Sequence, residues 1–322
     1  MQIGIVLPSF SSDSHRWSAG ELRHAIRRIS DADFEGAYFL EHLTRPATYN
    51  TAWMEPVTTA AWAAGVAGDV AIGTSVLVAS LRNPVILTWQ LLTLQHLTQQ
   101  PLRIGVGAGY VPAEFEAVAL PLKDRGKRLD RFLEMFDKAS LHGIIDTSAD
   151  GEPIEPIEIG PASEIRTRTM VGGASRSGID AEAGFPPAVL RRILRWKGWI
   201  SSPKGISELR DDWHLICDAA DGQAIAHDHL NYVHISHQGT ADDAIDEQGT
   251  AFEWLYGAER GRRHAVDNCL VGTREQIGER LLALGELGVG RTVLQLVAPT
   301  PHGWHTQFDR LESLVEDLHL LE

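Results

Sequence analysis

Short apolar runs alternate with amphipathic stretches along most of the chain. The first run, IGIVLP at 3–8, predicts a strand, and the stretch that follows repeats apolar residues at the spacing of one helix face. Four consecutive strand–helix units of this kind are typical of a parallel sheet with crossover helices. The pattern predicts strands at 3–8, 36–40, 70–78 and 102–107, and helices at 19–33, 55–68, 83–97 and 125–140.

The same alternation returns in the second half of the chain. Gly288 stands where a glycine commonly follows the end of a helix. Here the pattern predicts strands at 166–173, 198–201, 230–236 and 291–298, and helices at 187–196, 206–220, 274–288 and 308–321. Roughly eight strands that alternate with helices predict a single α/β domain, a (β/α)8 TIM-type barrel. An open, doubly wound sheet is the alternative architecture.

Two stretches interrupt the alternation. Residues 146–164, DTSADGEPIEPIEIGPASE, are rich in proline, glycine and acidic residues, which predicts a surface insertion or a β-hairpin. Residues 176–187, RSGIDAEAGFPP, form a second loop-like stretch. We therefore expect one barrel domain over residues 1–322 with surface insertions at these two places.

Composition narrows the classes of function. The formal net charge of −14 would repel nucleic-acid phosphates and anionic lipid, so neither is an expected partner. No apolar run approaches 18 residues, and the N-terminus lacks a basic region before its short apolar run, so we predict neither a membrane span nor a signal peptide. The chain has two cysteines, Cys217 and Cys269, which is too few for a disulfide framework. A cytoplasmic location is expected.

The stretch RIGVGAGYVPAEF at 103–115 places glycines at 105, 107 and 109. A dinucleotide fingerprint needs its third glycine one position later, usually in the first strand–helix unit, with a helix starting directly afterwards. This stretch lies in the fourth unit, and no helix is expected immediately after Pro112. The glycines could make room for a neighbouring layer, or let a planar ligand approach the backbone at the strand end that carries a barrel's active site.

Polar residues follow two other predicted strands. In FLEHL, Glu41 and His42 stand at the end of the second strand, either where the loop returns to water or on the active-site rim. His42 could there donate or accept a proton near neutral pH. In MVGGASRSG at 170–178, glycines, two serines and Arg176 follow the fifth strand, which suits a phosphate without matching a P-loop or a hydrolase elbow.

A histidine-rich stretch, AHDHLNYVHISH, occupies residues 226–237. Histidines two residues apart on a strand could bind a metal ion. We favour the simpler interpretation, in which His227 and His229 lie in a loop before the strand at 230–236 and are solvated or hydrogen-bonded. No metal site is expected.

Several of these pieces together resemble the luciferase-like flavin monooxygenases, a family that includes oxidoreductases dependent on the deazaflavin coenzyme F420. The matching stretches span nearly the whole chain in the family's order: IGIVLPSF, GAYFLEH, IGTSVLVASLRNP, RIGVGAGYVPAEF with RGKRLDRFLEMF, MVGGASR, GWI, LVGTREQIGERLLALGELGV and RLESLVEDL. The resemblance implies a TIM-type barrel that binds FMN or F420 at the carboxyl ends of its strands. It also implies a homodimer.

The resemblance further implies roles for individual residues. His42 matches a histidine near the reactive ring, and Ser75–Val76 matches a bulge that holds a non-prolyl cis peptide behind the ring. Tyr110 stands where sugar-phosphate dehydrogenases of the family carry a glutamate, which argues against that activity. The expected cofactor-binding residues are Glu41, Ser75, Val76, Gly107, Gly109, Tyr110, Gly172, Gly173, Ala174, Ser175 and Arg176. The resemblance implies that Gly172, Gly173, Ala174 and Ser175 form a phosphate-binding turn.

The expected function is therefore that of a flavin-dependent oxidoreductase acting on a small organic substrate. It would be a monooxygenase supplied with reduced FMN, with a separate flavin reductase as a partner, or an F420-dependent hydride-transfer enzyme. His42 is the expected proton donor. A non-catalytic flavin-binding barrel and a metal-dependent barrel hydrolase are the alternatives.

Overall fold

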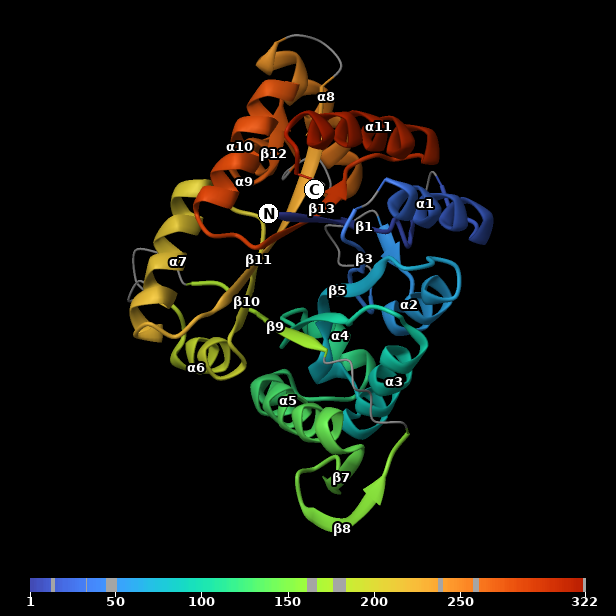
Figure 1. Cartoon of the computed structure of the whole chain (residues 1–322), viewed down its shortest axis with the longest axis vertical. Helices are drawn as coiled ribbons and strands as arrows, with labels where there is room; N and C mark the ends of the chain where they lie inside the picture. The colour runs from blue at the N-terminus through green and yellow to red at the C-terminus, as the bar shows by residue number, and fades with distance from the viewer. Residues whose placement is uncertain are drawn as a thin grey trace.

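The computed structural model describes residues 1–12, 15–32, 34–44, 51–160, 167–175, 184–236, 240–256 and 261–320. Within this part of the chain, eight parallel strands form a closed barrel (Figure 1). They are β1 (Gln2–Val6), β3 (Gly36–Phe39), β5 (Ala71–Val78), β6 (Arg103–Gly107), β9 (Arg168–Gly172), β10 (Gly198–Ser201), β11 (Ala226–Ile235) and β13 (Arg291–Leu296). The pairings of β1 with β13 and of β10 with β11 close the ring, so the TIM-type barrel is confirmed and the open sheet is wrong.

Helices surround the barrel and bury their apolar faces against it. In α1, the Ser18 side chain accepts from the Glu21 N–H and the Glu21 carboxylate accepts from the Ser18 N–H, so this capping box fixes the helix start. Each fully buried aliphatic side chain, such as Ile26, contributes about 1.5–3 kcal/mol. The helices are α1 (Ala19–Asp31), α2 (Pro56–Ala64), α3 (Pro84–Leu97), α4 (Pro112–Ala117), α5 (Arg125–His142), α6 (Pro187–Trp196), α7 (Ile206–Ala220), α8 (Ala241–Tyr256), α9 (Gly261–Asn268), α10 (Arg274–Glu286) and α11 (Pro301–Asp317), with 3-10 turns η1 (Ala79–Leu81) and η2 (Leu122–Asp124).

The structure corrects three sequence-based boundaries. A short helix, α4, begins directly at Pro112, where none was expected. β11 begins at Ala226, so His227 and His229 lie on a buried strand and not in a loop. α11 begins at Pro301, seven residues before the predicted start at 308, because the Thr300 side chain caps it there.

The insertion expected at 146–164 contains an antiparallel hairpin. Its strands, β7 (Ile144–Thr147) and β8 (Pro153–Glu158), extend from one end of the molecule's long axis, and α8 lies at the other end (Figure 1). A second small antiparallel pair joins β2 (Phe10–Ser12) to β4 (Thr51–Trp53). A further strand, β12 (Leu270–Gly272), extends the sheet beside β11. Of the second expected insertion, residues 176–183 lie outside the described residues.

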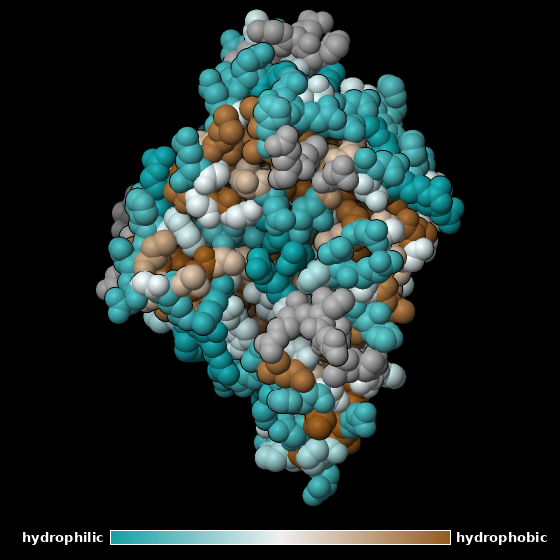
Figure 2. All heavy atoms as spheres, in the orientation of Figure 1, coloured by the Kyte–Doolittle hydropathy of each residue, from teal (hydrophilic) through white to brown (hydrophobic). Residues whose placement is uncertain are grey.

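Polar side chains cover most of the face in Figure 2, with apolar ones in separate small groups. No helix in the described ranges is both long enough and apolar enough to span a membrane.

One large side chain fills the amino-terminal end of the barrel interior. A Cβ atom on Gly4 or Gly73 would overlap the ring of Tyr38, so glycine at these positions makes room for it. The Tyr38 hydroxyl donates to Glu35 at 2.7 Å, and Glu35 pairs with Arg291 at 2.9 Å. Arg291 also pairs with Asp228, and Arg103 with Glu35. This packed and charge-paired end leaves the open space of the barrel at the carboxyl ends of the strands.

Candidate active site

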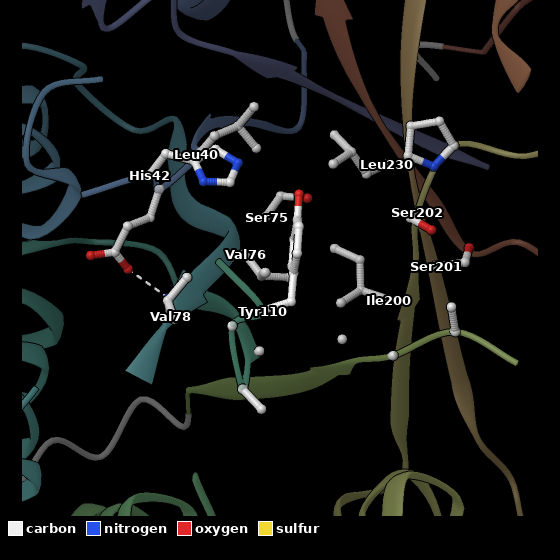
Figure 3. A pocket seen from close by; sticks show the side chains of 18 of the residues that line it. Leu40, His42, Ser75, Val76, Val78, Tyr110, Ile200, Ser201, Ser202 and Leu230 are labelled. Carbon is white, nitrogen blue, oxygen red and sulfur yellow. Dashed lines mark hydrogen bonds between the residues drawn. The ribbon is translucent and has the colours of Figure 1, made fainter. Parts of the chain in front are cut away.

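A cavity of about 610 Å³ lies at the carboxyl ends of the barrel strands. Its walls come from the ends of β3, β5, β6, β9, β10 and β11 and from β4 at the rim. The residues proposed from the sequence line this cavity, except that Ser175 does not and Arg176 lies outside the described residues. In Figure 3, Leu40 and His42 lie on one side of the Tyr110 ring, and Ile200 and Leu230 on the other.

Val76 forms part of one wall and lies over bare backbone. The Ser75–Val76 peptide bond is cis, as the resemblance implied, and the pairing of β5 with β6 shifts register at this point. Added Cβ atoms on Gly105, Gly107 and Gly172 would lie 3.3, 3.1 and 3.2 Å from the Val76 methyl groups. The glycines of β6 and β9 therefore make room for the Val76 side chain, which presents its other surface to the cavity.

Gly109 has a different structural role. Its φ angle is +71°, a left-handed conformation that favours glycine. A Cβ atom there would also lie 2.5 Å from a Val78 methyl group. This residue turns the chain from β6 toward Tyr110, whose side chain is 67% exposed beside the cavity.

His42 is held by a carboxylate that sequence reasoning missed. Its Nδ1 lies 3.0 Å from Oε1 of Glu114, the third residue of α4. The same oxygen accepts the backbone N–H of Leu43 at 2.9 Å, and the Glu114 side chain is 1% exposed. Tyr110 approaches the His42 ring edge-on, with 6.3 Å between ring centroids. Helix α4 thus brings a buried acid to the residue that could move a proton.

Glu41 lines the cavity but is held by the protein itself. Its carboxylate accepts the backbone N–H of Val78 at 2.5 Å, the bond drawn in Figure 3, and pairs with Arg82. Arg82 also pairs with Glu55, the N-cap of α2, at 2.7 Å. Burial raises the pKa of Glu41 although the Arg82 charge opposes that change. Glu41 therefore braces the rim between β3 and β5.

The turn after β9 brings Gly172, Gly173 and Ala174 to the cavity. A Cβ atom on Gly173 would overlap Val189 of α6, so this helix packs directly on the turn. The indole N–H of Trp199 donates to the Gly173 carbonyl at 2.9 Å and fixes the turn from behind. Part of the predicted phosphate-binding turn therefore reaches the cavity as backbone.

A comparison with models of protein families agrees with this geometry. The model described as luciferase-like monooxygenase matches residues 1–183, more than half of the chain. The chain belongs to the luciferase-like monooxygenase family. No curated protein sequence matches the chain.

Solved structures similar to this luciferase-like barrel include both cofactor classes. Monooxygenase RslO1 from Streptomyces bottropensis aligns with a TM-score of 0.78 at 17% identity, covering 99% of this chain and 100% of that one. An F420-dependent secondary alcohol dehydrogenase, bound to an F420–acetone adduct, aligns with a TM-score of 0.74 at 14% identity and 98% coverage of each chain. The oxygenating constituent of 3,6-diketocamphane monooxygenase from Pseudomonas putida, in complex with FMN, aligns with a TM-score of 0.68 at 17% identity, covering 97% and 96%.

The cavity of this family member offers a bound group both apolar surface and polar atoms. Val76, Ile200 and Leu230 supply apolar surface. Three buried polar groups have no hydrogen-bond partner among the residues that the structure describes: the Ser75 hydroxyl, the Thr51 hydroxyl and the Trp53 indole N–H. All three residues line the cavity, and buried polar atoms of this kind normally have partners. The isoalloxazine or deazaflavin ring of FMN or F420 has both an apolar face and polar edge atoms.

The histidines of β11 lie behind the cavity wall. Ser201 Oγ bonds to His229 Nδ1 at 2.8 Å and to His227 Nε2 at 3.2 Å. The His227 ring stacks against both Trp199 and Trp213, the second of which belongs to α7, and His227 is not among the residues that line the cavity. Burial lowers the pKa of both rings, that of His229 to about 3 with a contribution from the Lys204 charge. Among the described residues, no group of three or more metal-ligating side chains is placed to hold a metal ion.

Proposed function

We propose that this chain is a flavin-dependent oxidoreductase that acts on a small organic substrate. The observation that carries the proposal is one cavity that joins His42, which is held by a buried carboxylate, to the wall formed by Val76. The neighbouring Ser75 hydroxyl has no hydrogen-bond partner in the described part of the chain. A bound FMN or F420 would supply the electrons or hydride for the reaction. The reaction is either oxygenation with reduced FMN or hydride transfer with F420.

The residues of this chain would bind and orient the cofactor. Val76 would pack against the ring, and Ser75 would satisfy its hydroxyl on a polar ring edge. The backbone of Gly172, Gly173 and Ala174 is our proposed place for the phosphate, with Ser175 and Arg176 completing the turn.

His42 is our proposed catalytic residue. When Glu114 accepts its Nδ1–H, the proton that His42 gains or donates during the reaction is the one at Nε2. The apolar side chains of Leu40, Ile200 and Leu230 would help to exclude water from this proton transfer.

Partners follow from the cofactor. If FMN is used, the enzyme needs a source of reduced FMN, for which we propose a separate flavin reductase. If F420 is used, the deazaflavin carries the hydride and no reductase is required for the half-reaction on the substrate. We also propose a homodimer, which size-exclusion chromatography with light scattering would test.

Cofactor titration tests the proposal and separates the two classes. FMN and F420, each oxidised and reduced, are titrated into the purified protein while cofactor and tryptophan fluorescence are recorded. We expect one cofactor to bind in the micromolar range or tighter. Failure of both cofactors to bind would overturn the proposal.

Turnover is then followed with the bound cofactor and a panel of small alcohols, ketones and aromatic compounds. His42→Gln should keep the cofactor affinity and lose about 10²–10⁴-fold in kcat. His96→Gln, a matched change at an exposed histidine of α3, should retain both. Binding without turnover on any substrate would favour the non-catalytic flavin-binding barrel.

A further inference from the structure

Glu114 is a buried acid next to the proposed catalytic histidine. It follows the strand β6 by only a short turn and enters the cavity wall from α4. Its side chain is almost fully shielded from water, and a buried carboxylate is costly unless it is hydrogen-bonded or paired. Its Oε1 atom receives two such bonds, from His42 Nδ1 at 3.0 Å and from the Leu43 N–H at 2.9 Å.

This contact determines which nitrogen of His42 carries a proton. A carboxylate only accepts hydrogen bonds, so the His42 Nδ1 that faces it is the protonated nitrogen of the neutral ring. Nε2 is then the nitrogen that gains a second proton and gives it up again. The negative charge of Glu114 stabilises the imidazolium that forms when Nε2 is protonated, as the buried aspartate of a Ser-His-Asp triad does.

Glu41, the acid beside His42 in the sequence, is engaged elsewhere. It accepts the Val78 N–H and pairs with Arg82. Of these two acids, Glu114 contacts the His42 imidazole, and the contacts of Glu41 within the described residues are with other groups.

We propose that Glu114 is the positioning residue of His42: it fixes the Nδ1–H tautomer, orients the ring toward the cavity and stabilises its protonated form. The inference rests on the proposed function, because the proton transfer by His42 belongs to that function. The geometry it invokes, however, exists without cofactor or substrate and can be measured on the protein alone.

Glu114→Gln is the decisive variant. Glutamine keeps the size of the side chain and removes its negative charge. Its amide can accept from Nδ1–H through the oxygen or donate to a bare Nδ1 through the nitrogen, so it no longer enforces one tautomer of His42. Glu116→Gln, an exposed position of the same helix, is the matched control. Circular dichroism and cofactor affinity should be unchanged in both variants.

The first readout is spectroscopic and independent of turnover. With ¹⁵N-labelled histidine, the wild-type protein should show His42 in the Nδ1–H form at neutral pH, with His42→Gln identifying the signal. Glu114→Gln should shift it toward a mixture of tautomers, whereas Glu116→Gln should not. A wild-type His42 in the Nε2–H form would overturn the proposal, even if the protein turned out to have no flavin-dependent activity.

The second readout is kinetic. We expect Glu114→Gln to lower kcat by about 10–100-fold with little change in KM, and to alter the pH profile of kcat. Combined with His42→Gln, it should cost nothing beyond the single histidine change, because both act through one imidazole. Glu114→Asp, which keeps the charge, should recover part of the rate. Independent, multiplying losses in the double variant, or an unaltered pH profile in Glu114→Gln, would show that Glu114 only supports the fold.

If Glu114→Gln does not fold, the tautomer measurement on the wild-type protein and the kinetics of Glu114→Asp still decide between the two roles. A wild-type Nδ1–H signal, with a lowered kcat at unchanged KM in the shorter Glu114→Asp, would support the proposal, and a kcat of Glu114→Asp equal to that of the wild type would overturn it. An Nε2–H signal would overturn it.

Discussion

Acid should destabilise this protein through His229, and replacing that residue should flatten the pH dependence of its stability. The His229 ring is fully buried, with Ser201 Oγ 2.8 Å from Nδ1 and the Asn231 amide 3.0 Å from Nε2. Burial and the nearby Lys204 charge lower its pKa from 6.5 to about 3. The native state keeps the ring neutral at pH values where the unfolded chain takes up a proton.

The sign and size follow from proton linkage. Between pH 6.5 and about 3, the unfolded state binds more protons at this site, so the free energy of unfolding falls as the pH falls. Each pH unit across that window removes about 1.4 kcal/mol, so His229 alone accounts for about 5 kcal/mol over the whole window. A typical domain is stable by only about 5–15 kcal/mol, so a loss of this size is a large part of the total.

Urea unfolding followed by circular dichroism, at pH values from 7.5 down to 4.5, measures this dependence. His229→Gln removes the titrating ring and retains a hydrogen-bonding side chain. Below pH 6, the free energy of unfolding of both proteins should fall with each pH unit, and the fall should be smaller in His229→Gln by about 1.4 kcal/mol. His96→Gln, an exposed control on α3, should keep the wild-type slope. Equal slopes for wild type and His229→Gln would refute the reasoning, because the native ring would then accept the proton.

Three further substitutions test other parts of the structure. Gly4→Ala places a methyl group against the Tyr38 ring inside the barrel, and should lower the free energy of unfolding by about 1–3 kcal/mol in urea titrations. Arg82→Gln leaves Glu41 buried without its cation and should cost about 3 kcal/mol at pH 7, which the same titration measures. Ser75→Ala should not lower Tm in the cofactor-free protein, since its hydroxyl has no partner there among the described residues, but it should weaken cofactor binding about tenfold in fluorescence titrations; unchanged affinity would remove Ser75 from the cofactor site.

The barrel was predictable because each of its strands is a short apolar run beside a periodic helix. The start of β11 was not, since AHDHLN reads as a polar loop. In the fold, successive side chains of this stretch point to opposite faces of the strand. Asp228 points into the barrel and pairs with Arg291, and His229 points away from the cavity and bonds to the Ser201 hydroxyl. Because these polar side chains are hydrogen-bonded or ion-paired, they can be buried in a strand, although their hydropathy alone predicts exposure to solvent.

Residues of the candidate site could be predicted from the sequence where they directly follow a predicted strand, because the carboxyl ends of the strands carry the active site of a barrel. His42 was found in this way, and Tyr110 was found through the family resemblance; both line the cavity. Glu114 was missed because its importance lies in a partner 72 positions earlier in the sequence, and only the fold brings the two together. An acid soon after the glycines of β6 is the signal that could have suggested it. The pairing of Arg82 with both Glu41 and Glu55 likewise depends on the fold, since Arg82 follows β5 and the two acids lie between β3 and α2.

The bare glycines behind Val76 have a consequence for how this cavity can change. One side chain covers Gly105, Gly107 and Gly172, which belong to two neighbouring strands. The space behind it is already filled, so a larger residue at position 76 can grow only into the cavity. A smaller one would uncover a furrow across both strands. Substitution at this one position would therefore change the width of the cavity along the β6–β9 wall without rebuilding the strands.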